Sequence, residues 1–180
     1  MKSLRVFIPF IAAMFFIGCP ARSIQPLFAE KESVLLPGLA GTWMSEEDIY
    51  TFEQLPGNHY RALIRSKTES DSAVYMVSSG KLGAYWFLDS SPIKNSDEHH
   101  YLSVHVFTRI EVRGDTMRFA TLEADWLKKQ IESNAIVVTH TMRENEVLLT
   151  ATTKELQKFL TSIASNNEAF PNPATFVRSR

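Results

Sequence analysis

Five histidines are the side chains of this sequence best suited to metal binding or proton transfer. His99, His100 and His105 lie close together in the sequence, and Asp97 and Glu98 directly precede them. A zinc site needs three or four such ligands converging at about 2.0 to 2.3 Å. The adjacent His99 and His100 could bind one metal ion together only with an unusual backbone conformation. We therefore expect a solvated acidic loop here and no metal site.

His140 is the other histidine with a defined setting. In an extended strand it would share one face with Ile136, Val138 and Met142. A histidine at such a position usually lies in the core and bonds to a neighbour. Contact with a ligand, or proton transfer, is the alternative role.

Motifs for common catalytic and cofactor sites do not occur in the sequence. There is no Gly-x-Ser-x-Gly segment, and seven glycines in the whole chain leave little room for a phosphate-binding loop. The acidic residues are scattered, so that no spacing forces two carboxylates into one site. We expect no cofactor, and a hydrolase-like enzyme is the least favoured of the three functions considered below.

The N-terminus has the pattern of a secretory signal peptide. Lys2 and Arg5 form a positive start, and no charged residue follows from Val6 to Gly18. This apolar run has the length of a signal-peptide core and is too short to span a bilayer. The sequence therefore predicts a signal peptide at 1–18 and export from the cytoplasm.

Phe16-Ile17-Gly18-Cys19 resembles the bacterial lipobox, with Phe16 in place of the commoner leucine. The resemblance implies cleavage before Cys19, the only cysteine of the chain, and acylation of that residue. Cys19 would then anchor the protein at a membrane of the cell envelope, facing the periplasm. The alternative is ordinary cleavage after Ala21-Arg22-Ser23, which would leave Ile24 as the first residue, or after Ala29, which would leave Glu30.

Composition and charge limit the choice of partners. The chain has 19 basic and 20 acidic residues, and no basic run longer than a pair. A nucleic-acid partner is not expected without such a patch. Residues 19–36 are expected to be a tether. Residues 37–180 are expected to form a single domain, which is long enough to bury a sizeable core.

Alternating apolar and polar residues predict a mostly β domain. Residues 101–113 alternate most clearly, and Gly114-Asp115 should turn the chain into a hairpin partner. A helix is expected at 123–133, and a second, amphipathic helix should begin at Thr152 with a capping box to Glu155. Further strands are expected at 49–52, 59–65, 73–78, 84–89, 116–122, 136–142, 146–150 and 175–178. Strands joined by short turns favour an antiparallel up-and-down barrel, because closure removes the sheet edges. A β-sandwich is the alternative.

Gly41-Thr42-Trp43, near the start of the first expected barrel strand, resembles the G-x-W signature of lipocalins and related calycins. The order of elements is also similar to that of lipocalin-like exported bacterial proteins of unassigned function. In those families the tryptophan closes one end of the barrel and an arginine near the last strand packs over it. The resemblance implies these structural roles for Trp43 and Arg178.

We expect a membrane-anchored exported domain that binds a small apolar ligand or a lipid inside the barrel. A filled barrel that binds another envelope protein by its surface is the alternative. The residues expected to line a ligand pocket are Tyr60, Tyr75, Trp86, Val104, Val106 and His140.

Overall fold

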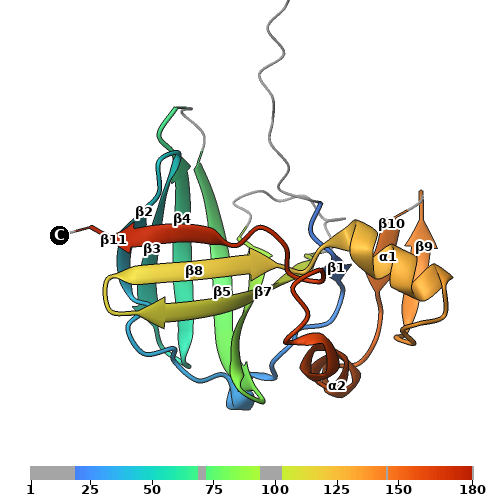
Figure 1. The fold of residues 1–180 in the computed structure, drawn as a ribbon. Helices are drawn as coiled ribbons and strands as arrows, with labels where there is room; N and C mark the ends of the chain where they lie inside the picture. Colours follow the sequence, from blue (N-terminus) through green and yellow to red (C-terminus); the bar gives the residue numbers. More distant parts are fainter. Residues whose placement is uncertain (1–18, 69–71, 94–102, 145, 180) are drawn as a thin grey trace, which may run out of the picture.

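The computed structural model describes residues 19–68, 72–93, 103–144 and 146–179 (Figure 1). The expected loop at 90–100, with His99 and His100, falls mostly outside these residues. The elements in chain order are β1 (Arg22–Ser23), the 3-10 helix η1 (Glu30–Glu32), β2 (Gly41–Met44), β3 (Asp48–Leu55), β4 (His59–Ser66), β5 (Ser72–Leu82), β6 (Tyr85–Pro92), β7 (His105–Arg113), β8 (Thr116–Thr121), α1 (Ala124–Glu132), β9 (His140–Arg143), β10 (Glu146–Leu149), α2 (Thr153–Ile163) and β11 (Ala174–Arg178).

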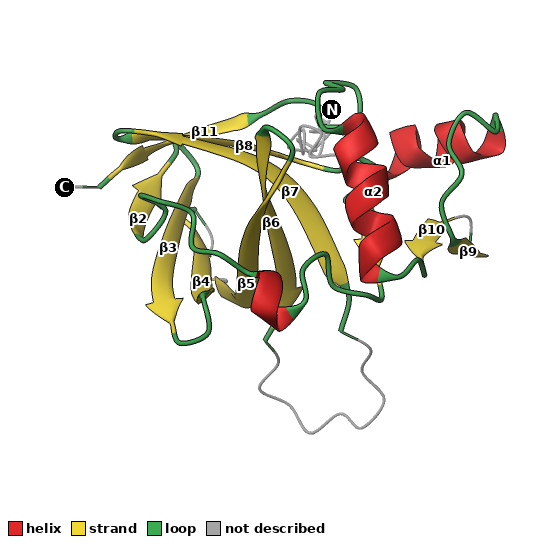
Figure 2. Cartoon of the chain, turned by 90° about the horizontal axis from the view of Figure 1, so that it is seen from below, coloured by secondary structure: helices red, strands yellow, loops and turns green. Residues whose placement is uncertain are grey.

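The predicted antiparallel barrel is confirmed. Strands β2 to β8 form an up-and-down meander, and β6 pairs with β7 as well as with β5. Strand β11 closes the barrel between β8 and β2, so that eight strands form the ring. The closing strand follows the segment that carries α1, β9, β10 and α2, and this segment lies to one side of the barrel (Figures 1 and 2).

Strands β9 and β10 lie outside the barrel, contrary to their expected place in a simple meander. β10 pairs in parallel with β1, which in turn pairs with the His105 end of β7. The sheet therefore continues from the barrel wall through β1 to β10 and β9. Of the strand expected at 136–142, only the part from His140 onward is extended and paired, and β9 reaches Arg143.

Both helices begin as the sequence predicts. Thr152 caps α2, and its side chain accepts a hydrogen bond from the backbone N–H of Glu155, whose carboxylate accepts from the backbone N–H of Thr152. α2 buries Leu156, Phe159, Leu160 and Ile163. α1 is capped by Glu123. The buried residues of both helices belong to a cluster outside the barrel, where α2 contacts β5 and α1 contacts β10.

Two clusters of buried side chains result from this arrangement. One fills the barrel and includes Trp43, Phe52, Tyr60 and Phe176. The other lies between the outer face of the sheet and the helices. Strand β7 contributes to both, because Ile110 points inward while Phe107 points toward the helices. This explains why the side chains of β7 are mostly apolar on the inward face and only partly polar on the outward face.

Residues 19–36 pack into the fold, whereas the sequence suggested a tether. Ala21, Leu27 and Phe28 are buried in the outer cluster, and β1 lies between β7 and β10. The ring of Phe28 lies so close to Gly80 that a Cβ atom there would come within 2.4 Å of it. The burial of this segment depends on contacts with distant strands, and no alternation of apolar and polar residues in the segment predicts it.

Candidate functional site

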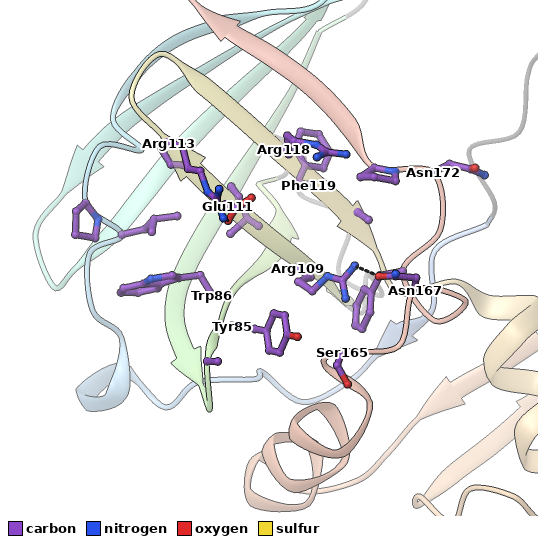
Figure 3. Close-up of a pocket in the computed structure, with 18 residues that line it drawn as sticks. Tyr85, Trp86, Arg109, Glu111, Arg113, Arg118, Phe119, Ser165, Asn167 and Asn172 are labelled. Atoms are coloured by element: carbon purple, nitrogen blue, oxygen red, sulfur yellow. Dashed lines mark hydrogen bonds and ion pairs between the residues drawn. The ribbon is translucent and has the colours of Figure 1, made fainter.

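A cleft of about 890 Å³ lies where β7 extends past the start of β6. The pairing of the two strands begins at Trp86 opposite Ile110, so the Arg113 end of β7 projects beyond it. The segment after α2, with Asn167 and Asn172, forms the opposite wall (Figure 3), and Phe170 of the same segment also lines the cleft. The volume is within the usual range for small-molecule sites.

Arg109 lies at the centre of the cleft (Figure 3). Its guanidinium donates to the carbonyl of Ala164 at 2.7 Å and to Oδ1 of Asn167 at 3.0 Å. Its Cζ atom is 5.0 Å from the ring centroid of Phe170 and 5.7 Å from that of Tyr85. Burial lowers the pKa of Arg109 below its usual value, and the coulombic effect of Tyr85 opposes this shift. No carboxylate of a described residue pairs with this cation.

Arg113, Glu111 and Arg118 form the outer polar rim. Arg113 donates from Nε to Oε1 of Glu111 at 2.7 Å, and its Nη2 lies 2.5 Å from the same oxygen. Arg118 lies directly opposite Glu111 on β8 and is exposed. Within the described part of the chain, no hydrogen bond or ion pair joins the Arg118 side chain to another residue. Three arginines and one glutamate therefore give the cleft an excess of positive charge.

The side of the cleft that faces the barrel interior is apolar. Trp86, Val112 and Phe119 are partly buried and pack against the cluster inside the barrel. Leu36 and Ile110 belong to the same cluster and also face the cleft. These side chains come from the inward face of the strands, whereas the arginines come from the outward face. The cleft thus exposes both faces of β7 at one place.

Aromatic side chains fill much of the barrel interior. The ring of Tyr50 is 4.7 Å from Phe176 and 5.6 Å from Phe119, measured between centroids. Phe52 contacts Tyr60, whose hydroxyl donates to the carbonyl of Leu36 at 3.2 Å. Burial raises the pKa of Tyr50 to about 12, and the nearby Asp48 and Tyr75 add to this effect. Burial also raises the pKa of Tyr60.

Of the six residues predicted to bind a ligand, three contribute to the cluster inside the barrel: Tyr60, Tyr75 and Trp86. Trp86 alone among them lines the cleft. Tyr60 is buried in the barrel core and Tyr75 packs against it. Val104 precedes β7, and Val106 pairs with both Ser90 and Arg22. They therefore lie elsewhere on the barrel, toward its centre or toward β1.

His140 lies outside the barrel, in β9 at the far edge of the sheet. Its Nδ1 is 2.8 Å from the carbonyl of Val138, and the side chain is partly exposed. The expected inward position is wrong for this residue, because strands β1 and β10 separate it from the barrel wall. Its hydrogen-bond partner among the described residues is the backbone of the nearby Val138.

Arg178 and Trp43 have the contact that the calycin resemblance implies. They are paired residues of β11 and β2, and the Arg178 Cζ atom lies 4.2 Å from the ring centroid of Trp43. Trp43 is fully buried, and its Nε1 donates to the carbonyl of Leu39 at 2.8 Å. Gly41 has a φ of +123°, and a Cβ there would lie 2.7 Å from Arg178 Nη1. The glycine of the G-x-W segment is therefore needed for this contact.

Buried Asp89 and the partly exposed His105 form a pair that no spacing in the sequence indicates. Asp89 Oδ1 is 2.7 Å from His105 Nδ1, and Oδ2 accepts from the backbone N–H of Leu27 at 2.8 Å. Asp89 is 3 % exposed. Ser23 lies beside His105 on β1 but is fully buried, and its hydroxyl donates to the Gln25 carbonyl. The pair joins β6, β7 and the N-terminal segment, and Ser23 is not placed to attack a substrate.

Other kinds of site have less support. No three potential metal ligands gather among the residues that the structure describes. Of the helices described, none is long and apolar enough to cross a membrane. Cys19 is exposed at the start of the described chain, and its carbonyl accepts from the N–H of Ala124 at 3.0 Å.

Comparisons of the chain with protein families, with curated proteins and with solved structures gave no match. The arginine-rich cleft beside Trp86 is therefore assigned from its own geometry. Alternation of the sequence places Arg109 and Arg113 on the outward face of their strand. The wall formed by residues 165–173 arises only in the folded chain.

Proposed function

We propose that this protein is exported, is held at a membrane by acylated Cys19, and binds a ligand with an apolar body in the cleft beside Trp86. The observation that carries the ligand proposal is a cleft of about 890 Å³ with an apolar wall formed by Leu36, Trp86 and Val112. A partly exposed tryptophan at the mouth of such a cleft offers a large apolar surface to a ligand. The ligand would lie against the side of the barrel and not at its filled centre.

The position of Cys19 supports the anchor. The residue is exposed, and the chain after it joins the fold at once, since Ala21 donates to the carbonyl of Leu122 at 2.8 Å. Acyl chains on Cys19 would contribute roughly 0.8 kcal/mol per buried CH₂ group. They would therefore hold the barrel close to the bilayer surface, near a supply of lipid ligands.

Intact mass of the membrane-extracted protein, produced in a bacterial host, tests the anchor. We expect a chain that begins at Cys19 and carries acyl groups, and we expect that mass to disappear in Cys19→Ser. An unmodified chain beginning at Ile24 would contradict the anchor. It would leave the ligand proposal standing for a diffusible exported protein.

Fluorescence of Trp86 tests the cleft. Trp43 is fully buried and Trp126 is 9 % exposed, so a ligand in the cleft should act mainly on Trp86. The protein for this test is the chain 19–180 with Cys19→Ser, which keeps every other described residue. We expect saturable changes with dodecanol or a charged amphipath of the same chain length, and we expect them to be lost in Trp86→Phe. No response to either compound would contradict ligand binding in the cleft.

A surface-binding module for another envelope protein is the second candidate function. The observation that favours it is the aromatic packing around Tyr50 and Phe176, which occupies much of the barrel interior. Photo-crosslinking from position 85, beside the cleft, would test it in the producing cells. One specific protein adduct, together with no lipid response of Trp86, would favour this candidate over ligand binding.

A further inference from the structure

Arg109 and Arg118 are diagonal neighbours on the outward face of the barrel. Arg109 lies directly opposite Ala120 in the β7–β8 register, and Arg118 is two residues before Ala120 on the same face. Diagonal neighbours in an antiparallel pair are about 7 to 8 Å apart, within reach of long side chains. Ala120, the residue opposite Arg109, has only a methyl side chain, and both arginines and Ala120 line the cleft.

Both arginines have donors to offer. Arg109 uses two of its nitrogens toward Ala164 and Asn167, and a guanidinium has five N–H groups. The side chain of Arg118 bonds to no other residue of the described chain, and Arg113 is already paired with Glu111. The positive charge that Glu111 does not neutralise therefore lies with Arg109 and Arg118.

The burial of Arg109 adds a second, independent point. Its guanidinium contacts Phe170 and Tyr85 and has no carboxylate partner among the described residues. Partial burial lowers the pKa of this group, because desolvation disfavours the charged form. A bound anion would compensate it, because charge-assisted bonds from arginine to oxyanions are strong.

We propose that the cleft binds a single-chain amphipath, with its anionic head group between Arg109 and Arg118 and its apolar chain against Trp86 and Val112. This proposal rests on the proposed function and adds the chemical class of the ligand. The head group would be an oxyanion, either a phosphate monoester or a carboxylate. The ligand would cross the projecting end of β7, because the arginines lie on its outward side and the apolar wall on its inward side.

Three probes distinguish the parts of the proposal. The chain 19–180 with Cys19→Ser is titrated with dodecyl phosphate, with dodecanol and with inorganic phosphate, by calorimetry and by Trp86 fluorescence. We expect dodecyl phosphate to bind about tenfold tighter than dodecanol at low salt. This advantage should shrink at high salt, since the rim is exposed to solvent. Inorganic phosphate should bind far more weakly than dodecyl phosphate.

Arg118→Gln is the decisive variant, because Arg118 is exposed and the fold does not depend on its contacts. We expect about a tenfold loss of affinity for dodecyl phosphate and no change for dodecanol. Arg65→Gln, an exposed arginine of β4 far along the barrel wall, is the matched control and should bind as the parent does. Arg109 is left unchanged, since it also holds the end of α2.

Each other outcome has one meaning. Equal affinity for dodecyl phosphate and dodecanol would overturn the anionic head group and leave the proposed function standing. Unchanged binding by Arg118→Gln would do the same. Inorganic phosphate binding as tightly as dodecyl phosphate would show a site for a free anion and overturn the amphipath. No binding of either chain-bearing probe would overturn both proposals.

Discussion

The guanidinium of Arg178 lies over the indole of Trp43, with its Cζ atom 4.2 Å from the ring centroid. The same guanidinium donates to the backbone carbonyls of Gly38 and Ala40, the residues just before the G-x-W segment. Its Nε also lies 3.7 Å from Asp115 in the β7–β8 turn. One side chain near the C-terminus thus holds the start of the barrel, its end and one hairpin together.

Replacing Arg178 should therefore destabilise the whole barrel. We expect Arg178→Ala to lower the free energy of unfolding by about 2 kcal/mol, from the lost cation–π contact and the lost bonds to carbonyls. Arg178→Lys should recover part of this loss, because lysine keeps the charge but lacks the planar fork. Urea denaturation followed by tryptophan fluorescence measures both. Parental stability in Arg178→Ala would show that the contact is incidental.

The Asp89–His105 pair should hold the N-terminal segment in place. The two carboxylate oxygens of Asp89 face His105 Nδ1 and the backbone N–H of Leu27. Asp89→Asn replaces one of these oxygens with an NH₂ group, which cannot accept a hydrogen bond. We expect a loss of about 2 to 3 kcal/mol in the free energy of unfolding. Hydrogen exchange at the Leu27 amide should also become faster. A double-mutant cycle of Asp89→Ala with His105→Ala measures the coupling, and additive effects would contradict a direct bond.

Tyr50 should make the protein sensitive to alkaline pH. Its pKa is raised to about 12 in the folded protein, whereas an unfolded tyrosine ionises near pH 10. Between these values the unfolded chain loses a proton that the folded chain keeps, so stability falls as the pH rises. The full decline is at most about 2.7 kcal/mol, at about 1.4 kcal/mol per pH unit. Below about pH 10 this group has no such effect.

The variant Tyr50→Phe isolates that effect. We expect its free energy of unfolding to decline less steeply than that of the parent from pH 10 to about 12. Tyr85→Phe changes an exposed ring and should follow the parent. Parallel curves for the parent and Tyr50→Phe would show that Tyr50 ionises equally in both states.

Local patterns in the sequence predict much of the barrel. Alternation indicates the strands, the Thr152–Glu155 capping box marks the start of α2, and the G-x-W segment indicates the partner of Arg178. The alternation and the capping box are each contained in a short stretch of chain, and the contact between Arg178 and Trp43 follows from the resemblance to lipocalins. The antiparallel meander follows because consecutive strands are joined by short turns.

The parts that could not be predicted depend on contacts between distant residues. Residues 19–36 have no regular alternation of apolar and polar residues. Their burial depends on distant residues, because Leu27 donates to Asp89 and the ring of Phe28 packs against Gly80. The segment around His140 alternates in the way a barrel strand does, yet it lies outside the barrel. The reason is that β1 and β10 lie between it and β7 in the sheet. The cleft needs Asn167 and Phe170 beside Arg109, and no spacing in the sequence relates them.

Gly80→Ala tests whether the N-terminal segment is part of the fold. A Cβ at position 80 would lie 2.4 to 2.8 Å from three ring atoms of Phe28, and the ring is itself buried in the outer cluster. We expect a loss of about 2 to 3 kcal/mol in the free energy of unfolding, as overpacking in a core typically produces. Phe28→Leu should recover part of the loss in the double variant, because a smaller side chain makes room for the methyl group. Limited proteolysis should cut residues 24–36 faster in Gly80→Ala than in the parent. If the stability and the cleavage rate both match those of the parent, the segment does not pack on β5 in solution.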